Sequence, residues 1–222
     1  ARGALSRAVR DRSRRAEEGK IVQATRRRER IGSGRTRSRV AVTRTRPETV
    51  LDDVGALMRG LDYGRALSPG RRTILKDNIS WHLPYLSANT TPWQLEGVVR
   101  TLRQDGYRDL LGLHNQTVVT DAHRGDKLNK FAGVYRRYEV PTVDNFSPEC
   151  RWVRIEPKAP LPVLDRLFGE VRVPEVMLGT NVVHLPTVKT HVYTTMTGAR
   201  KNAFGGLLRE NRHWAHTDIH AT

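Results

Sequence analysis

Apolar residues in this chain follow two spacings, one typical of helices and the other of short buried strands. Helical spacing runs over 50–61 and again over 93–102, where Thr91 and Pro92 suit an N-cap and a first helical position. Short apolar or β-branched runs predict strands at 39–45, 72–75, 109–113, 152–155, 170–173 and 181–185. Strands and helices therefore alternate, which predicts an α/β fold with a mainly parallel sheet flanked by helices.

Polar residues gather where two of these strands end. Lys76 and Asn78 follow the strand at 72–75, and a polar, glycine-bearing segment at 184–206 follows the strand at 181–185. Ligands of open parallel sheets bind beyond the carboxyl ends of the strands, so we expect a site there. The structural alternatives are a solvated surface loop and a turn built on the Asp-Asn pair.

The residue types in this region suit an anionic ligand. Lys189 and Lys201 are candidate catalytic residues, because a desolvated lysine acts as a base or nucleophile, while a charged one holds a phosphate or carboxylate. His191 is a candidate general acid or base. The candidate ligand-binding residues offer donors or let a ligand approach the backbone; they are Lys76, Asn78, Thr197, Gly198, Asn202 and Gly205. A helix that begins near Thr197 would add backbone amides to the site.

Two motifs resemble the signature of domain-of-unknown-function family 362, a bacterial and archaeal family. They are Pro-x-x-Lys-x-His, here Pro186 to His191, and Thr-Gly-x-x-Lys-Asn-x-x-Gly, here Thr197 to Gly205. The resemblance extends over about residues 38 to 220 and implies a fold and candidate residues, but no reaction. Members often carry a ferredoxin-like segment with clustered cysteines, whereas this chain has Cys150 alone. The family domain normally continues past an Arg-x-x-His element, seen here near Arg212, so we expect a domain truncated at its C-terminal end.

Positive charge is concentrated at the N-terminal end. Residues 1–46 contain 15 Arg and Lys20 against four acidic residues, a net charge of +12 of the total of +16. We therefore divide the chain into a basic, flexible arm at 1–37 and an α/β domain at 38–222. Such an arm suits a polyanion or an acidic partner protein, although without aromatic residues it cannot stack on bases.

Other features give expectations about metals, cofactors and location. His213 and His216 are spaced as metal ligands on a helix often are, with His184 or His191 as a conceivable third ligand. His114 and His123 follow another strand, where histidines are more often simply exposed. Because neither nucleotide-binding glycine motif is present, the cofactor is unknown. No apolar run is long enough to cross a membrane, and we expect a cytoplasmic protein of unknown oligomeric state.

Three functions are compatible with these observations. The first is an enzyme-like domain that binds a small anionic substrate or cofactor at the strand ends. The second is a non-enzymatic binding or assembly protein that uses its basic arm on nucleic acid or an acidic partner. The third is a redox accessory protein whose iron–sulfur cluster lies outside this chain.

Overall fold

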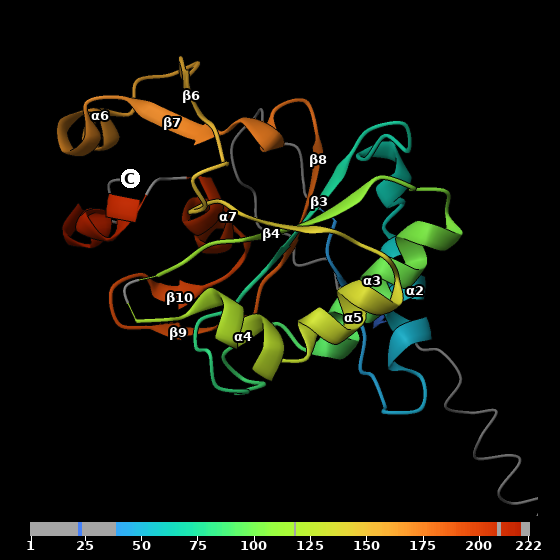
Figure 1. The fold of residues 1–222 in the computed structure, drawn as a ribbon. Helices are drawn as coiled ribbons and strands as arrows, with labels where there is room; N and C mark the ends of the chain where they lie inside the picture. Colours follow the sequence, from blue (N-terminus) through green and yellow to red (C-terminus); the bar gives the residue numbers. More distant parts are fainter. Residues whose placement is uncertain (1–21, 24–38, 118, 208–209, 219–222) are drawn as a thin grey trace, which may run out of the picture.

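The computed structural model describes residues 22–23, 39–117, 119–207 and 210–218, and its centre is a parallel β-sheet (Figure 1). The sheet has four strands in the order β5-β4-β3-β8, and each neighbouring pair is parallel. Their bounds are Thr73–Asp77 for β3, Leu110–His114 for β4, Thr142–Asp144 for β5 and Asn181–Leu185 for β8. The predicted α/β class with a mainly parallel sheet is thereby confirmed.

The strand order reverses direction once. From β3 the chain passes through α3 (Pro92–Gln104) to β4, and then through α4 (Ala122–Leu128) and α5 (Phe131–Arg137) to β5. The later strand β8 returns to the opposite side of β3, where Lys76 pairs with His184 in register. The point at which the order reverses therefore lies between β3 and β8, and such switch points leave a crevice at the carboxyl ends of the strands.

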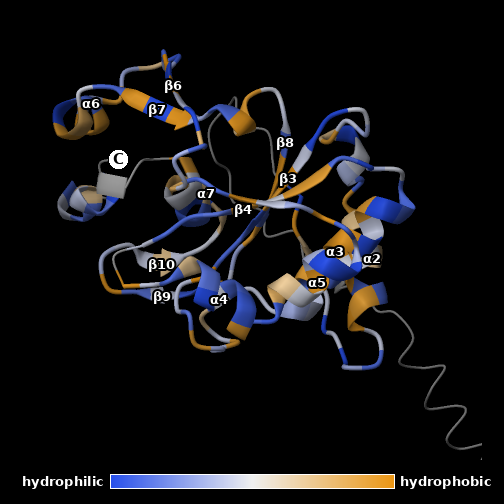
Figure 2. Ribbon diagram, in the orientation of Figure 1, coloured by the Kyte–Doolittle hydropathy of each residue, from blue (hydrophilic) through white to orange (hydrophobic). Residues whose placement is uncertain are grey.

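Helices cover one face of the sheet with the larger hydrophobic core. There α3 and α5 pack on β3 and β4, and α2 (Val50–Gly60) packs on α3. The predicted N-cap of α3 is confirmed, because the Thr91 hydroxyl accepts a hydrogen bond from the amide of Gln94. Figure 2 shows hydrophobic residues in β3 and β4 and a mixture of hydrophobic and hydrophilic residues along α3, as a helix with one buried face requires.

The second face is covered by a smaller set of contacts. Ile74, Leu111 and Leu113 of the sheet pack with Met177 of the short helix η2 (Glu175–Met177) and with Leu207 of α7 (Ala199–Leu207). A separate small core joins the antiparallel pair β6 (Trp152–Ile155) and β7 (Val171–Pro174) to α6 (Pro162–Phe168). Phe204 of α7 packs against this third core, so α7 lies between the sheet and the β6–β7 lobe.

Short elements complete the described part. Lys189–His191 (β9) and Thr195–Thr197 (β10) form an antiparallel hairpin after β8, and a 3-10 helix, η3, follows at Glu210–Asp218. The strand predicted at 39–45 is limited to Ala41–Val42 (β2). A further 3-10 turn, η1, lies at Tyr63–Arg65. None of the described helices has the length and apolar character that a membrane crossing requires.

The basic arm lies almost entirely outside the described residues. Within 1–37 the structure describes Val22–Gln23 (β1), which pairs antiparallel with β2. The division at 37 and 38 and the flexibility of the arm therefore stay predictions.

Candidate functional site

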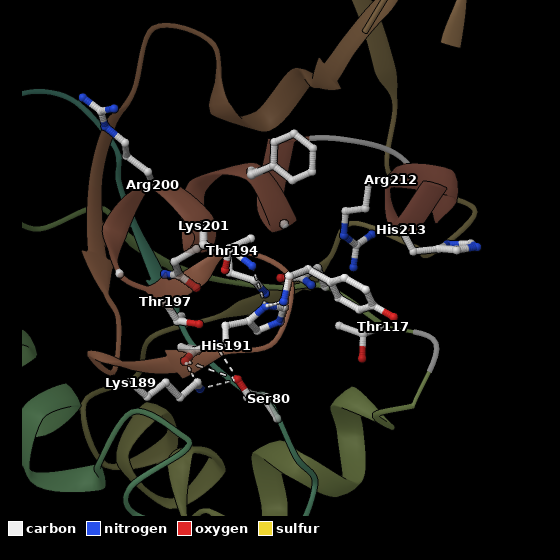
Figure 3. A pocket seen from close by; sticks show the side chains of 18 of the residues that line it. Ser80, Thr117, Lys189, His191, Thr194, Thr197, Arg200, Lys201, Arg212 and His213 are labelled. Carbon is white, nitrogen blue, oxygen red and sulfur yellow. Dashed lines mark hydrogen bonds between the residues drawn. The ribbon is translucent and has the colours of Figure 1, made fainter. Parts of the chain in front are cut away.

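A deep cleft of about 1750 Å³ opens beyond the carboxyl ends of the sheet strands (Figure 3). Its walls come from the loops after β3, β4 and β5, from the β9–β10 hairpin, and from α7 and η3. The two sequence segments predicted to share a site, Lys76 to Asn78 and 184–206, meet in this cleft. Because β3 and β8 flank the point where the strand order reverses, the cleft occupies the usual ligand position of an open parallel sheet.

The first turn of α7 faces the cleft. Thr197, Gly198 and Ala199 line it, and the first intrahelical bond runs from the Asn202 amide to the Gly198 carbonyl. The preceding amides of the first turn therefore have no intrahelical acceptor, which makes them suitable for an anion. The hydroxyl of Thr197 is buried and finds no hydrogen-bond partner among the described residues. The predicted ligand-binding residues Thr197 and Gly198 thus lie where a hydroxyl and backbone amides are free of partners among the described residues.

Lys201 lies in the same turn and is available to a ligand. Its side chain is half-buried, lines the cleft, and makes no hydrogen bond or ion pair within the described part of the chain. Burial lowers the pKa of this lysine, and the nearby positive charge of Arg212 adds to the decrease. In Figure 3 Lys201 lies beside Thr197, whereas its neighbour Arg200 points away from both.

Lys189 is placed differently from Lys201. Its ammonium donates to Asn78 Oδ1 at 3.1 Å, to Ser80 Oγ at 2.5 Å and to the carbonyl of Ala88. Since an ammonium has three N–H donors, all of them are engaged. Burial, followed by the charge of Lys201, lowers the pKa of Lys189 to about 8. Lys189 therefore ties the β9–β10 hairpin to the loop after β3, and it contributes charge to the cleft.

Lys76 and Asn202 hold α7 onto the end of β3. The Lys76 side chain is buried and its ammonium donates to the carbonyl of Asp77 at 2.7 Å. Burial, opposed by the charge of Asp77 and aided by that of Arg212, lowers the pKa of Lys76 to about 8. The side-chain amide of Asn202 donates from Nδ2 to the Lys76 carbonyl at 2.8 Å. Gly206 leaves room for the lysine, because a Cβ there would lie 3.0 Å from Lys76 Cε.

Asn78 and Gly205 complete the predicted ligand-binding set. The Asn78 amide nitrogen donates to Ser80 Oγ at 3.2 Å, so its side chain positions Lys189 as well as lining the cleft. Gly205 also lines the cleft, near the side chains of Asn115 and Arg212. All nine predicted catalytic and ligand-binding residues are thus brought to one cleft, and their functional roles stay predictions.

His191 projects from the hairpin with a defined tautomer. Its Nδ1 accepts hydrogen bonds from the amides of Tyr193 and Thr194, each at 3.2 Å, which places the ring proton on Nε2. Burial first, and then the charge of Lys201, lowers the pKa of His191. The imidazole is therefore neutral at neutral pH, and its Nε2–H is a hydrogen-bond donor rather than an acid, since only the imidazolium gives up a proton readily. The general acid or base role of His191 stays a prediction.

The histidines of η3 stand at the edge of the cleft. His216 stacks on His191 with ring centroids 6.0 Å apart, and His213 contacts Trp214 edge-on. Within the described residues no group of three or more His, Cys, Asp or Glu side chains is arranged to hold a metal ion. The metal hypothesis for His213 and His216 therefore gains no third ligand from these ranges.

The lysines and arginines that line the cleft make it positively charged. Lys76, Lys189, Arg200, Lys201 and Arg212 line it, and its described lining includes no aspartate or glutamate. Sequence reasoning did not identify several lining residues, among them Ser80, Thr117 and Phe146. They come from loops that periodicity does not mark. The strand-end rule provides the signal that could have found Ser80 and Thr117, since both lie shortly after a strand.

A second polar cluster lies buried under the opposite face of the same strand ends. His114, expected to be exposed, is buried: its Nδ1 lies 3.5 Å from Asp77 Oδ1 and its Nε2 3.6 Å from Asp126 Oδ1. The Tyr135 hydroxyl donates to Asp77 Oδ2 at 2.8 Å, and Gly112 leaves room for its ring. Although burial alone would lower the pKa of His114, the carboxylates of Asp77 and Asp126 raise it. By contrast, His123 is largely exposed as expected, at 3.5 Å from Asp144.

Fold and cleft together define the class of this protein, an α/β domain with a cationic cleft at its switch point. The sequence model of the family described as domain of unknown function (DUF362) matches residues 73–222, two thirds of the chain, and the chain belongs to this family. The matched region contains β3, β8, the hairpin and α7, which are the elements that build the cleft. Comparisons with curated proteins and with solved structures give no match.

Proposed function

We propose that this domain binds a small anionic substrate or cofactor at the first turn of α7 and acts on it as an enzyme. The observation that carries the proposal is that Lys201 and Thr197 lie beside each other in the cleft (Figure 3). Both side chains line the cleft beside the first-turn amides of α7, and neither has a hydrogen-bond partner among the described residues. An anion there would satisfy the ammonium, the hydroxyl and the amides together.

The remaining charged groups support an anion rather than a cation. Lys76 and Arg212 add positive charge, and no acidic side chain of the described lining competes for it. His191, with its proton on Nε2, is a group we assign to donating a hydrogen bond to the ligand, and Lys189 holds the hairpin that carries it.

Calorimetric titration of the full chain with pyrophosphate tests this site. The variant Lys201→Met keeps the length of the side chain and removes its charge, and Lys158→Met is the matched control in an exposed loop outside the cleft. We expect Lys201→Met to weaken binding by about tenfold or more, as the loss of a charge-assisted hydrogen bond does. Equal affinities for both variants, or no binding to the unaltered protein, would contradict the proposal.

An alternative function rests on the basic arm. The net charge of +12 on residues 1–46 favours contact with nucleic acid or an acidic protein. Its test is removal of residues 1–37, with affinity for a duplex DNA measured at two salt concentrations. Steep salt dependence that disappears with the arm supports it, whereas salt-independent binding overturns it. A redox accessory role rests on family association, and the single Cys150 adds nothing to it.

A further inference from the structure

The cleft is much larger than an inorganic anion needs. Its volume of about 1750 Å³ exceeds the roughly 300–1,000 Å³ of clefts that hold drug-sized ligands. The anion position at Thr197 and Lys201 takes up the part of this space at the first turn of α7. The rest of the cleft is therefore available to a larger group attached to the anion.

Aromatic side chains line that remaining space and are exposed to solvent. Trp81, after β3, is 45% exposed, Phe146, after β5, is 36% exposed, and Tyr193, in the hairpin, is 55% exposed. Aromatic rings of this size usually bury much more of their surface. Three such rings in one cleft, contributed by three separate loops, indicate a planar apolar partner.

One of these rings is tied to the anion position through the hairpin. Lys189 pairs with Thr197 in the hairpin register, and His191 lies two residues further along β9. That step is about 7 Å along an extended strand. Tyr193 lies 6.1 Å from His191 and 5.0 Å from His216, measured between ring centroids, and is tilted to both, so these three rings form one aromatic cluster. A ligand of modest length could therefore contact this cluster while its anionic group occupies the α7 turn.

We propose that the ligand is a nucleotide-like molecule, with phosphate at the first turn of α7 and a planar heterocycle against the aromatic residues of the cleft. This inference rests on the anion binding proposed above and extends it to the class of ligand. Aromatic side chains stack on the planar face of any nucleobase or similar heterocycle, and cations beside them hold the phosphate. No glycine-rich phosphate loop is required, because Thr197 and Gly198 with the α7 amides supply the same kinds of donor.

The test compares an anion without a ring, three nucleotides that carry both a phosphate group and a ring, and a nucleoside without phosphate. The full chain is titrated with pyrophosphate, ADP, UDP, FMN and adenosine. We expect at least one of the three nucleotides to bind about tenfold or more tightly than pyrophosphate, since stacking on an aromatic side chain contributes that much. Adenosine, which has no phosphate, should bind weakly or not at all.

A pair of tyrosine variants separates this inference from the proposed function. Tyr193→Ala should reduce the affinity for the best nucleotide toward that of pyrophosphate and leave pyrophosphate binding unchanged. Tyr85→Ala, a tyrosine 52% exposed and outside the cleft lining, should alter neither. If pyrophosphate binds through Lys201 but no nucleotide binds more tightly, the ring proposal is overturned and the anion site stands. If neither kind of ligand binds, both are overturned.

Discussion

The imidazole of His114 lies 3.5 Å from the carboxylate of Asp77, and both residues end parallel strands inside the protein. The opposite ring nitrogen faces Asp126 at 3.6 Å, so the buried imidazole lies between two acids. Both distances suit ion pairs and are longer than good hydrogen bonds. Although burial would raise the pKa of Asp77, His114, Lys76 and the Tyr135 hydroxyl lower it, which keeps the Asp77 carboxylate ionised.

We predict that His114→Leu destabilises the protein by about 3–5 kcal/mol, because it removes the partner that lies nearest the buried Asp77 carboxylate. The raised pKa of His114 also gives a signed pH dependence. Its stabilisation is complete below the unfolded pKa of about 6.5 and is lost as the pH rises through the folded pKa. Urea unfolding of both proteins between pH 6 and pH 9 checks this.

Comparing the unfolding free energies of wild type and His114→Leu at the same pH removes the contributions of other titrating groups. Lys76 and Lys189, whose pKa values are lowered to about 8, favour folding as the pH rises above that value, which is the opposite slope. The difference in unfolding free energy between wild type and variant should therefore shrink with rising pH. A difference that stays constant would show that His114 is uncharged in the folded protein.

The adjacent glycines of α7 provide a second prediction. A Cβ at Gly206 would lie 3.0 and 3.2 Å from Lys76 Cε and Cδ, whereas a Cβ at Gly205 meets nothing closer than 3.8 Å. Because Lys76 is buried and bonded to the Asp77 carbonyl, it has little freedom to move aside. We expect Gly206→Ala to cost about 1–3 kcal/mol. Gly205→Ala should be neutral or stabilising by up to about 1 kcal/mol in urea unfolding. Equal effects would mean that Lys76 moves freely.

Much of this fold could be predicted where apolar spacing repeats. The predicted helix over 50–61 and the predicted strands at the positions of β3, β4 and β8 are confirmed, because the helix carries apolar residues at helical spacing and each strand contains a short apolar run. Three elements give no such signal. The edge strand β5 has three residues, α4 buries only Ala122 and Gly125, and α6 buries only Leu164. Tertiary contacts, rather than local pattern, fix such elements.

The location of the candidate site could be predicted from the sequence, but the different roles of its lysines could not. Because ligands bind beyond the ends of parallel strands, the order of strands and polar segments along the chain is enough to place Lys76, Lys189 and Lys201 together. Sequence cannot reveal that the ammonium of Lys189 donates three hydrogen bonds, whereas that of Lys201 donates none within the described residues. Nor can it reveal the burial of His114, since a strand-end histidine faces either solvent or a helix depending on what packs there.

The different surroundings of Lys189 and Lys201 predict different effects on the hairpin. Lys189→Met removes three hydrogen bonds from an ionised donor, each worth roughly 1.5–3 kcal/mol at most. We expect amide hydrogen exchange across 188–197 to accelerate by about tenfold or more. Lys201→Met, the matched lysine without such bonds, should leave exchange there unchanged. Equal acceleration in both variants would show that the loss of charge, rather than the loss of the three bonds, loosens the hairpin.

Anion binding should weaken at a lower pH than ordinary lysines would allow. Lys76 titrates at about 8, and burial together with Arg212 lowers the pKa of Lys201 below 10.5. Sulfate keeps its charge over this range, so its affinity should fall between pH 7 and pH 9 as these cations lose their protons. The limiting slope is about tenfold per pH unit for each proton lost. Because the lowered pKa of His191 already leaves that ring neutral, it should not contribute.

Calorimetry in buffers of different ionisation enthalpy should detect proton uptake on sulfate binding near pH 8, and this uptake should be smaller in Lys201→Met. A sulfate affinity that is constant to pH 10 would contradict the assignment of lysines to the anion site.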